Sequence, residues 1–534
     1  MSTSESTIEP TPGCRAQTAR RTRARRAVAA ALAVAVVLAP LPGAVHAQSV
    51  FSGSLPPAPN LPPPLPPVSS ALPELGDSSQ VDLSPAQERK LGEAVIHQAR
   101  MRGAIMDDPE VNDYLNDLGQ RLVAAVPDAR MDFQFFAVND KEINAFALPG
   151  GFVGVNTGLI LLTQTESELA SVLGHEISHV TQHHIARMIA SQKDTMLMQL
   201  GALAVAILAA KAGGNSGGQA AQAAIASAQA LSIQQQLNFT RAHEYEADRI
   251  GFQRMVAAGF DPNAMASFMK RMQDATRFSD SGAPSYLRSH PVTSDRIAEA
   301  QARAQSVPYR QVPDSLDFQM VRALLRSYEG DARDAVAYFD RALADHRYNN
   351  LTATQYGLAA ALLRAQDFKR AKETVAALDK SGVQHPMIDA IAGHILMESG
   401  DLDGAIKRFK AALALYPNKH QLIYDYPQAL MRAGRNAEAA EFAEGELKRA
   451  PGDGQLHLIA ARAYGALDKV MKQHQHQGEY YAWQGDLTGA VTQFELASKA
   501  KDGNFYDASV VDARLRDLRK ELKDQPKENL KNQG

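Results

Sequence analysis

The sequence predicts a mainly α-helical chain, in which a helical domain with a small β-sheet (α+β) precedes an all-α superhelix of repeats. Residues 166–182 have helical spacing, whereas 133–138 and 151–155 are short segments rich in residues that favour strands. From about Asp317 onward, alanine-rich helical pairs recur at a regular interval. At 534 residues the chain is too long for one ordinary core, so two or more domains are expected.

Residues 1–47 are predicted to be a secretory signal peptide. Six arginines precede an apolar run at 27–39, and small residues stand at 45 and 47, so cleavage is expected after Ala47. The apolar run is too short to span a bilayer. Secretion is therefore expected, and an uncleaved N-terminus that tethers the chain to a membrane is the alternative.

Cleavage after Ala47 would change the composition of the mature chain. Cys14, the only cysteine, would be removed, so we expect neither a disulfide nor a thiolate metal ligand. Loss of six arginines and two glutamates would turn 56 basic and 59 acidic residues into 50 and 57, a net charge of −7. Nothing in this balance indicates a nucleic-acid partner. Residues 48–83 are rich in proline and predict a disordered linker.

The first folded domain is expected to cover 84–310. Ser84 followed by Pro85 is a typical helix start, and a second helix is expected around 109–125. A later strand is also considered as a strand that binds substrate: Gly151, Phe152, Val153, Gly154 and Val155. If it borders the cleft, it can pair with an extended polypeptide by β-augmentation. The alternative is a sheet that only bounds the core.

Residues 175–179 have the pattern H-E-x-x-H. Residues four apart share a helix face, so His175 and His179 can bind one zinc ion while Glu176 lies beside them. Zinc lowers the pKa of a water molecule that it binds, and Glu176 is the predicted general base. A chance match is the alternative, because the pattern fixes only three positions. His183 and His184 fit a surface helix better than a second metal site.

A catalytic zinc site usually has a third protein ligand. The spacing of a metzincin is absent, and no glutamate follows His179 within the next few helical turns. Glu244 and Asp248 are four residues apart on a predicted helix, so we expect Glu244 as the third ligand and Asp248 as the carboxylate that orients a ligand histidine. Glu246 would point elsewhere. The alternative for this segment is a solvated, charged helix.

An insert separates the two candidate metal-binding segments. Residues 196–210 are almost wholly apolar, and an alanine- and glutamine-rich helix is expected up to residue 236 after a glycine-rich turn. The apolar run falls short of the roughly 20 residues that span a bilayer. We expect a packed helical hairpin over the cleft, and peripheral contact with a membrane is the alternative.

Residues 315–520 are predicted to form the repeat domain, and 521–534 a polar tail. Five alanines follow short turns at intervals of 36, 34, 34 and 51 residues: Ala335, Ala371, Ala405, Ala439 and Ala490. The last interval equals one and a half units of 34. The best copy, with Gly393, Phe409 and Pro417, is spaced like a tetratricopeptide repeat. Such repeats stack into a superhelix that normally presents a concave surface to a partner protein.

Together, these motifs resemble the zinc metallopeptidase family of the CAAX prenyl proteases and their bacterial relatives. The resemblance rests on H-E-x-x-H at 175–179, Glu244-x-x-x-Asp248, the segment 144–151 and Ser289-His290-Pro291, and it covers about 84–300. It implies Glu244 as the third ligand, in agreement with the spacing. It also implies that His290 lies near the metal, as a catalytic transition-state donor or a removable fourth ligand.

With a secretion signal and C-terminal repeats, the chain resembles periplasmic members of this family. The resemblance implies a periplasmic zinc metalloendopeptidase, with one zinc ion per chain, that acts on unfolded or misassembled proteins. It implies a role in quality control of outer-membrane proteins, with the repeats recruiting the assembly machinery or the client. The alternative is a chaperone or assembly factor whose zinc site is latent because His290 occupies the open position.

Overall fold

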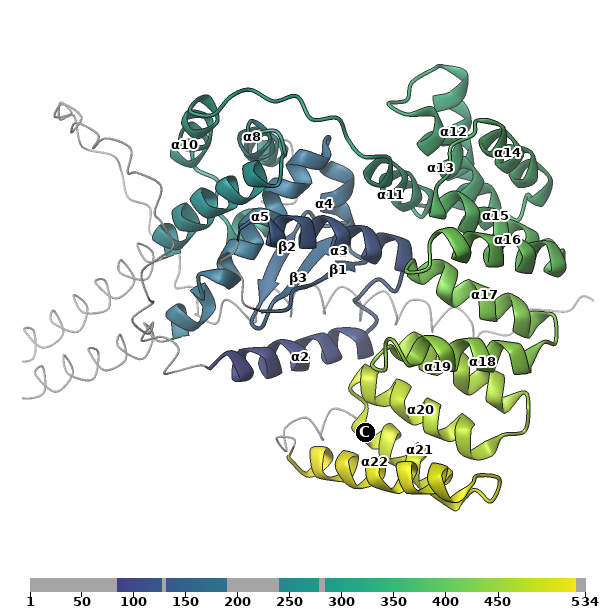
Figure 1. Ribbon diagram of the computed structural model, residues 1–534. Helices are drawn as coiled ribbons and strands as arrows, with labels where there is room; N and C mark the ends of the chain where they lie inside the picture. The colour runs from purple at the N-terminus through teal and green to yellow at the C-terminus, as the bar shows by residue number, and fades with distance from the viewer. Residues whose placement is uncertain (1–83, 127–130, 190–239, 278–283, 525–534) are drawn as a thin grey trace, which may run out of the picture. The chain divides into compact units, whose positions relative to one another are not determined.

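A computed structural model describes residues 84–126, 131–189, 240–277 and 284–524 of the chain. The predicted signal peptide (1–47), linker (48–83) and apolar insert (196–236) lie outside the described residues, as does most of the predicted polar tail. The described residues from Pro85 onward belong to one compact unit. They are mainly helical and contain one small β-sheet, which confirms the predicted fold class (Figure 1).

The part before the repeats begins with two helices at the predicted positions. Pro109 is the first residue of the second helix, and the side chain of Asp108 caps it by accepting a hydrogen bond from Val111 N at 3.0 Å. The elements follow in this order: α2 (Pro85–Met101), α3 (Pro109–Ala124), β1 (Gln134–Val138), β2 (Ala145–Leu148), β3 (Phe152–Asn156), α4 (Thr157–Leu162), α5 (Glu166–Thr181), a helix at 240–257, α8 (Ala264–Arg277), α9 (Ser285–Ser289) and α10 (Ser294–Gln305).

The sheet has the strand order β1-β3-β2, with β3 in the middle. β3 pairs in parallel with β1, where Phe135 opposes Val153, and antiparallel with β2, where Phe146 opposes Gly154. The strand predicted at 151–155 therefore exists, but both of its edges are already hydrogen-bonded. The expectation that it could pair with a substrate is wrong, because a new strand can be added only at an edge.

The two edge strands differ in how their backbones are covered. Along β1, Asn112 and Asn116 of α3 accept hydrogen bonds from the backbone N of Ala137 and Phe135 at 2.9 and 3.0 Å. Within the described ranges, no such hydrogen bond is made to the backbone at the outer edge of β2. β2 also packs against α5. Of the two edges, that of β2 is therefore the one available beside the motif helix.

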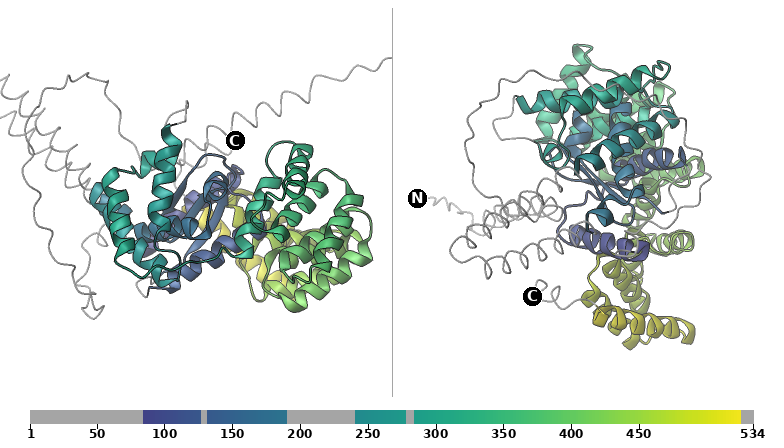
Figure 2. Two further views of the ribbon diagram at one scale, coloured as in Figure 1. Left: turned by 90° about the horizontal axis from the view of Figure 1, so that it is seen from above. Right: turned by 90° about the vertical axis from the view of Figure 1, so that its left-hand side faces the viewer.

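The repeat region is a succession of paired helices, which Figures 1 and 2 show following one another in chain order. Their bounds are α11 (Leu316–Ser327), α12 (Ala332–Ala344), α13 (Leu351–Arg364), α14 (Phe368–Lys380), α15 (Pro386–Glu398), α16 (Leu402–Leu415), α17 (His420–Arg432), α18 (Asn436–Leu447), α19 (Gly454–Gly465), α20 (Val470–Gln484), α21 (Leu487–Lys499) and α22 (Phe505–Asp524).

Small residues lie where the repeat helices approach each other closely. A Cβ atom added to Gly393 would lie 2.3 Å from the Phe409 ring, and one added to Gly478 would lie 2.5 Å from the Phe494 ring. The 51-residue interval contains α19 and α20 before α21, which accounts for the additional half repeat. The five alanines predicted to lie at helix contacts are all buried: Ala335, Ala371, Ala405, Ala439 and Ala490.

The predicted boundary between the domains falls in 306–315, a segment without helix or strand. One hydrophobic core nevertheless contains residues from both sides of it, from Val111 to Ile395. Acidic side chains of α3 also contact the repeats. Glu110 accepts a hydrogen bond from the hydroxyl of Tyr356 at 2.5 Å, and Asp117 pairs with Lys419 at 2.7 Å.

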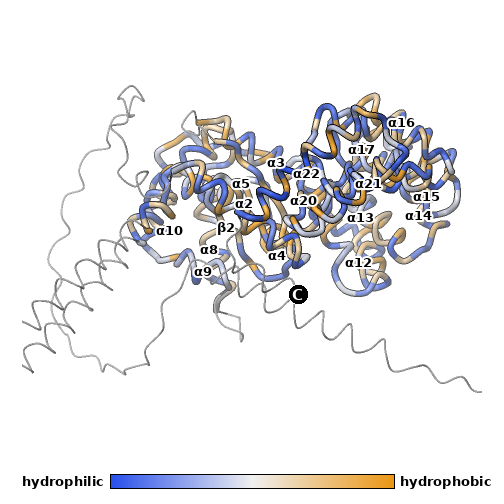
Figure 3. Tube along the Cα trace, turned by 90° about the horizontal axis from the view of Figure 1, so that it is seen from below, coloured by the Kyte–Doolittle hydropathy of each residue, from blue (hydrophilic) through white to orange (hydrophobic). Residues whose placement is uncertain are grey.

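Hydropathy along the chain follows this packing. Figure 3 shows hydrophilic and hydrophobic residues alternating along the repeat helices, as expected for helices that bury one face. In the part of the chain that the structure describes, no helix combines the length and the apolar character needed to cross a membrane.

Candidate metal centre

Helix α5 carries the H-E-x-x-H motif through the interior. Thr165 caps its N-terminus, and its hydroxyl accepts a hydrogen bond from Glu168 N at 3.2 Å. Nearly every side chain of α5 is buried, including His175 and Glu176, whereas His179 is partly exposed. Because buried polar groups need partners, the motif residues must be satisfied by neighbouring elements or by a bound ion.

Two glycines allow the helix at 240–257 to approach α5 closely. A Cβ atom added to Gly251 would lie 2.8 Å from the backbone N of His175, and one added to Gly174 would lie 3.0 Å from Gly251 O. Glu244 and Asp248 precede Gly251 by seven and three residues, so all three share one helix face. The glycine contact therefore brings Glu244 and Asp248 against the motif histidines.

Four side chains from three segments bring their ligand atoms within 4.8 Å of one another: His175, His179, Glu244 and His290. Nε2 of His175 lies 3.0 Å from Nε2 of His179, and each lies 3.5 Å from an oxygen of Glu244. Zinc bonds of about 2.0–2.1 Å in a tetrahedron place neighbouring ligand atoms about 3.3 Å apart. The observed separations fit such an ion.

A buried atom without a hydrogen bond points the same way. Among the described residues, Oε1 of Glu176 is buried and accepts no hydrogen bond. Burial of an unpaired carboxylate oxygen costs free energy unless a cation or water contacts it. Imidazole nitrogens with one carboxylate are a donor set that suits zinc. The residues present therefore fit the metal that the motif predicts.

Asp248 lies where its spacing placed it, behind His175. Its Oδ1 is 2.9 Å from Nδ1 of His175, so Nδ1–H donates to the carboxylate and Nε2 faces the other ligand atoms. Arg296, near the start of α10, donates paired hydrogen bonds of 2.7 and 2.8 Å to Asp248, and its Nη1 lies 2.9 Å from Glu244 Oε2. The sequence gives no sign of this arginine, because its partners lie some fifty residues away.

A second line of contacts reaches His179. Its Nδ1 lies 2.9 Å from Nδ1 of His184, and Nε2 of His184 lies 3.1 Å from Glu246, which also pairs with Arg187 at 2.8 Å. Burial lowers the pKa of His184 to about 4, so its ring is neutral at pH 7. Nε2–H of His184 then donates to Glu246, and its Nδ1 accepts from Nδ1–H of His179. That tautomer leaves Nε2 of His179 as a ligand atom.

The surface position expected for His184 is therefore wrong, whereas Glu246 lies outside the group of ligand atoms and contacts His184. Helix α5 ends at Thr181, and His183 adopts a left-handed backbone with a φ angle of 50°. This break turns the chain back and returns the buried His184 to His179. In a continuous helix, residues five apart point in different directions. No glycine or proline stands between Val180 and Arg187 to indicate this break in the sequence.

Comparison with known proteins decides the family. Residues 109–304 match peptidase family M48. The β-barrel assembly-enhancing protease of Escherichia coli (strain K12) is 33% identical over 454 residues, which are 84% of this chain and 92% of that protein. The chain belongs to peptidase family M48. This confirms the resemblance to a zinc metallopeptidase family and the prediction that the protein is a metallopeptidase.

Other relatives match shorter parts of the M48 chain. A Vibrio cholerae relative is 38% identical over 324 residues, which are 60% of this chain and 66% of that protein. A mitochondrial metalloendopeptidase of Schizosaccharomyces pombe is 30% identical over 188 residues, which are 35% and 51% of the two chains. Residues 396–463 match the tetratricopeptide repeat, which confirms the interpretation of the C-terminal region.

His290 completes the group of ligand atoms in this M48 centre. Its Nδ1 lies 3.3 Å from Nε2 of His175 and 3.0 Å from Oε1 of Glu244, and its Nε2 lies 3.6 Å from Oε1 of Glu176. The residue follows α9, and its backbone N donates to Tyr286 O at 2.7 Å. The buried Tyr286 ring lies 4.8 Å from the His290 ring and holds it in place.

The charges around the M48 centre favour a bound cation. Burial lowers the pKa of His175, but hydrogen bonds to Asp248 and Glu244 outweigh this effect and raise it to about 10. Burial raises the pKa of Glu244, yet His290 and His175 hold it well below its usual range, so the carboxylate stays ionised. A site that holds a proton this tightly also attracts a divalent cation, which competes for the same lone pairs.

Proposed function

We propose that this M48 protein is a periplasmic, zinc-dependent endopeptidase that cleaves unfolded or misassembled polypeptides. The proposal rests on the convergence of His175, His179 and Glu244 at tetrahedral separations, with Glu176 buried beside them. These three ligands would hold one zinc ion per chain. The predicted signal peptide supports the periplasm, and the name of the Escherichia coli relative supports a role in the quality control of outer-membrane β-barrel proteins.

The chemistry of peptide hydrolysis then divides between the ion and the chain. When bound, zinc supplies Lewis-acid polarisation and lowers the pKa of water. The carboxylate of Glu176 takes the proton of the attacking water and passes it to the leaving amine. Its Oε1 accepts no hydrogen bond from the described residues, so it is available for that proton. His290 is placed to donate to the oxyanion that forms.

The substrate backbone would be positioned by β2. This strand lies at the sheet edge beside α5, and its partner on the other side is β3. An extended polypeptide added to β2 would gain main-chain hydrogen bonds without a strong demand on its sequence. This mode of binding suits unfolded or misassembled clients. The tetratricopeptide repeats would recruit those clients or the outer-membrane assembly machinery.

A cleavage assay with matched variants tests the proposal. The mature chain (48–534), Glu176→Gln and Glu373→Gln are loaded with zinc and incubated with a reduced, unfolded model protein. Loss of the general base should lower the turnover of Glu176→Gln by about 10²- to 10⁴-fold, with its zinc content unchanged. Glu373 is exposed on α14 and serves as the charge control. Normal turnover in Glu176→Gln would refute the assigned base.

A second candidate function is supported by the position of His290. Because its Nδ1 stands among the other ligand atoms, His290 can fill the fourth position and keep the site latent while the repeats act as an assembly factor. His290→Ala should then raise the background cleavage of the unfolded protein. A fall in cleavage would instead assign His290 to stabilisation of the oxyanion.

A further inference from the structure

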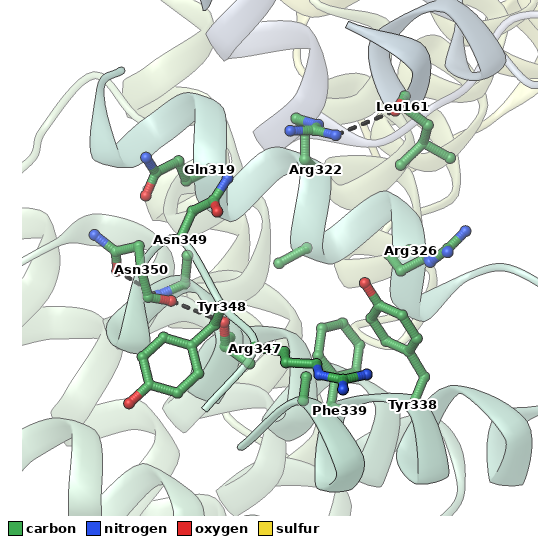
Figure 4. A pocket seen from close by; sticks show the side chains of 14 residues that line it. Leu161, Gln319, Arg322, Arg326, Tyr338, Phe339, Arg347, Tyr348, Asn349 and Asn350 are labelled. Atoms are coloured by element: carbon green, nitrogen blue, oxygen red, sulfur yellow. Dashed lines mark hydrogen bonds between the residues drawn. The ribbon is translucent and has the colours of Figure 1, made fainter. Parts of the chain in front are cut away.

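A pocket of about 280 Å³ lies in the first repeat, away from the metal centre (Figure 4). Its walls come from α11, α12, the connection 345–350 and the start of α13, and Leu161 of α4 also lines it. Three arginines line it, Arg322, Arg326 and Arg347, and the lining residues include neither aspartate nor glutamate. In Figure 4 the labelled side chains surround a common space. The pocket is therefore cationic.

Arg322 carries a charge that its surroundings compensate only in part. Its Nη2 donates to Leu161 O at 3.2 Å, and its guanidinium lies 5.3 Å from the centre of the Phe318 ring. Its Nε is buried and has no hydrogen-bond partner in the described part of the chain. Burial lowers the pKa of Arg322 against the opposing effect of Asp314. An anion in the pocket would restore the missing compensation.

The other two arginines leave positive charge at the pocket mouth. Arg326 stacks over Tyr338 at 4.7 Å and pairs with Glu329, which lies outside the lining. Arg347 is exposed, and no ion pair of its side chain is found among the described residues. Among the described residues, only one of the three guanidinium groups is therefore neutralised by a carboxylate, and Arg347 is an exposed group without an ion pair.

The start of α13 adds to the positive potential. Asn350 caps this 14-residue helix by accepting a hydrogen bond from Ala353 N at 3.0 Å, and Asn350, Ala353 and Thr354 all line the pocket. The N-terminus of a helix carries a partial positive charge that stabilises anions. This end of α13 and the guanidinium groups thus act on the same space. Their combination favours an anionic ligand.

We propose that this pocket binds the C-terminal carboxylate of a polypeptide. A planar carboxylate matches the paired donors of a guanidinium. Phe339, Ala323 and Ala342 supply apolar wall beside the arginines, which would take the terminal side chain; a phosphate has no group to use that wall. A chain end brings a carboxylate and an apolar side chain to the same place, and the lining offers guanidinium groups and an apolar wall side by side.

Peptides that differ only at their ends test this proposal. The probe is a dye-labelled peptide of sequence Gly-Ser-Gly-Ser-Ala-Phe with a free carboxylate, compared with its amide and with an amide that contains an internal aspartate. Binding is measured by fluorescence anisotropy in the mature chain with Glu176→Gln, so that cleavage does not interfere. Arg347→Gln and Arg322→Gln are combined with this background. Arg341→Gln, on the exposed face of α12 outside the pocket, is the matched control.

The proposal expects the free acid to bind at least about tenfold more tightly than either amide. Arg347→Gln should weaken binding of the free acid by about tenfold, the loss expected for one charge-assisted hydrogen bond, and Arg341→Gln should have no effect. Equal binding of the amides, no binding of the free acid, or an equal effect of Arg347→Gln and the control Arg341→Gln would overturn it. Inorganic phosphate that binds at Arg347 while the free-acid peptide does not would assign the pocket to a small anion instead.

Discussion

Replacing Gly251 by alanine should separate the two helices that hold the metal ligands. The new Cβ atom would lie 2.8 Å from His175 N and 2.9 Å from Gly174 C, both of which are backbone atoms that cannot rotate away. Ordinary contact begins at 3.4 Å, so the helices must move apart by the difference of about 0.6 Å. Metal ligands tolerate only about 0.2 Å of such displacement. The geometry of Glu244 relative to His175 would therefore be lost.

Overpacking of this kind costs roughly 1–3 kcal/mol, which corresponds to about 5- to 150-fold in an equilibrium constant. We expect Gly251→Ala to weaken zinc binding within this range, measured by competition with a fluorescent chelator, and to lower the midpoint of thermal unfolding. Gly445→Ala is the control, because no atom lies within 4 Å of its added Cβ. In a helix interior that change should stabilise the protein by about 0.5–1 kcal/mol. Unchanged zinc affinity in Gly251→Ala would refute the argument that this contact sets the ligand geometry.

Two further predictions follow from buried polar groups. His184→Ala and Glu246→Gln should each weaken zinc binding by about 10- to 100-fold through His179, and chelator competition that finds wild-type affinity would contradict the assigned contact. Burial and the neighbouring Asp108 raise the pKa of Glu110 to about 8, so the folded state binds more protons and stability should fall between about pH 4.5 and 8, by at most about 1.4 kcal/mol per pH unit. Urea unfolding at pH 6 and 8 should show a smaller fall in Glu110→Gln; parallel curves would contradict the raised pKa.

The local spacing of the sequence was sufficient to single out the candidate metal ligands. His175 and His179 are one turn apart, and so are Glu244 and Asp248, so each pair is placed by its own helix. The repeats were predictable for a related reason, because the same small residue must recur wherever the same helix contact recurs. Gly393 against Phe409 and Gly478 against Phe494 have the same spacing of 16 residues.

Features that depend on the tertiary arrangement could not be obtained in this way. The position of β3 between its neighbours is set by strand pairing across the chain, and its short apolar sequence fits a central strand as well as an edge. His184 reaches His179 only because His183 interrupts the helix. Arg296 meets Asp248 because α10 packs beside the helix at 240–257. No periodicity of the sequence signals the position of β3 or these two contacts.

Zinc content together with cleavage activity tests the central claim most directly. The mature wild-type chain, Glu176→Gln and His175→Ala are compared by elemental mass spectrometry and by turnover of one unfolded model protein. We predict one zinc ion per chain in the wild type and in Glu176→Gln, almost none in His175→Ala, and turnover in the wild type alone. Full zinc content in His175→Ala, or normal turnover in Glu176→Gln, would contradict the assignment of this centre.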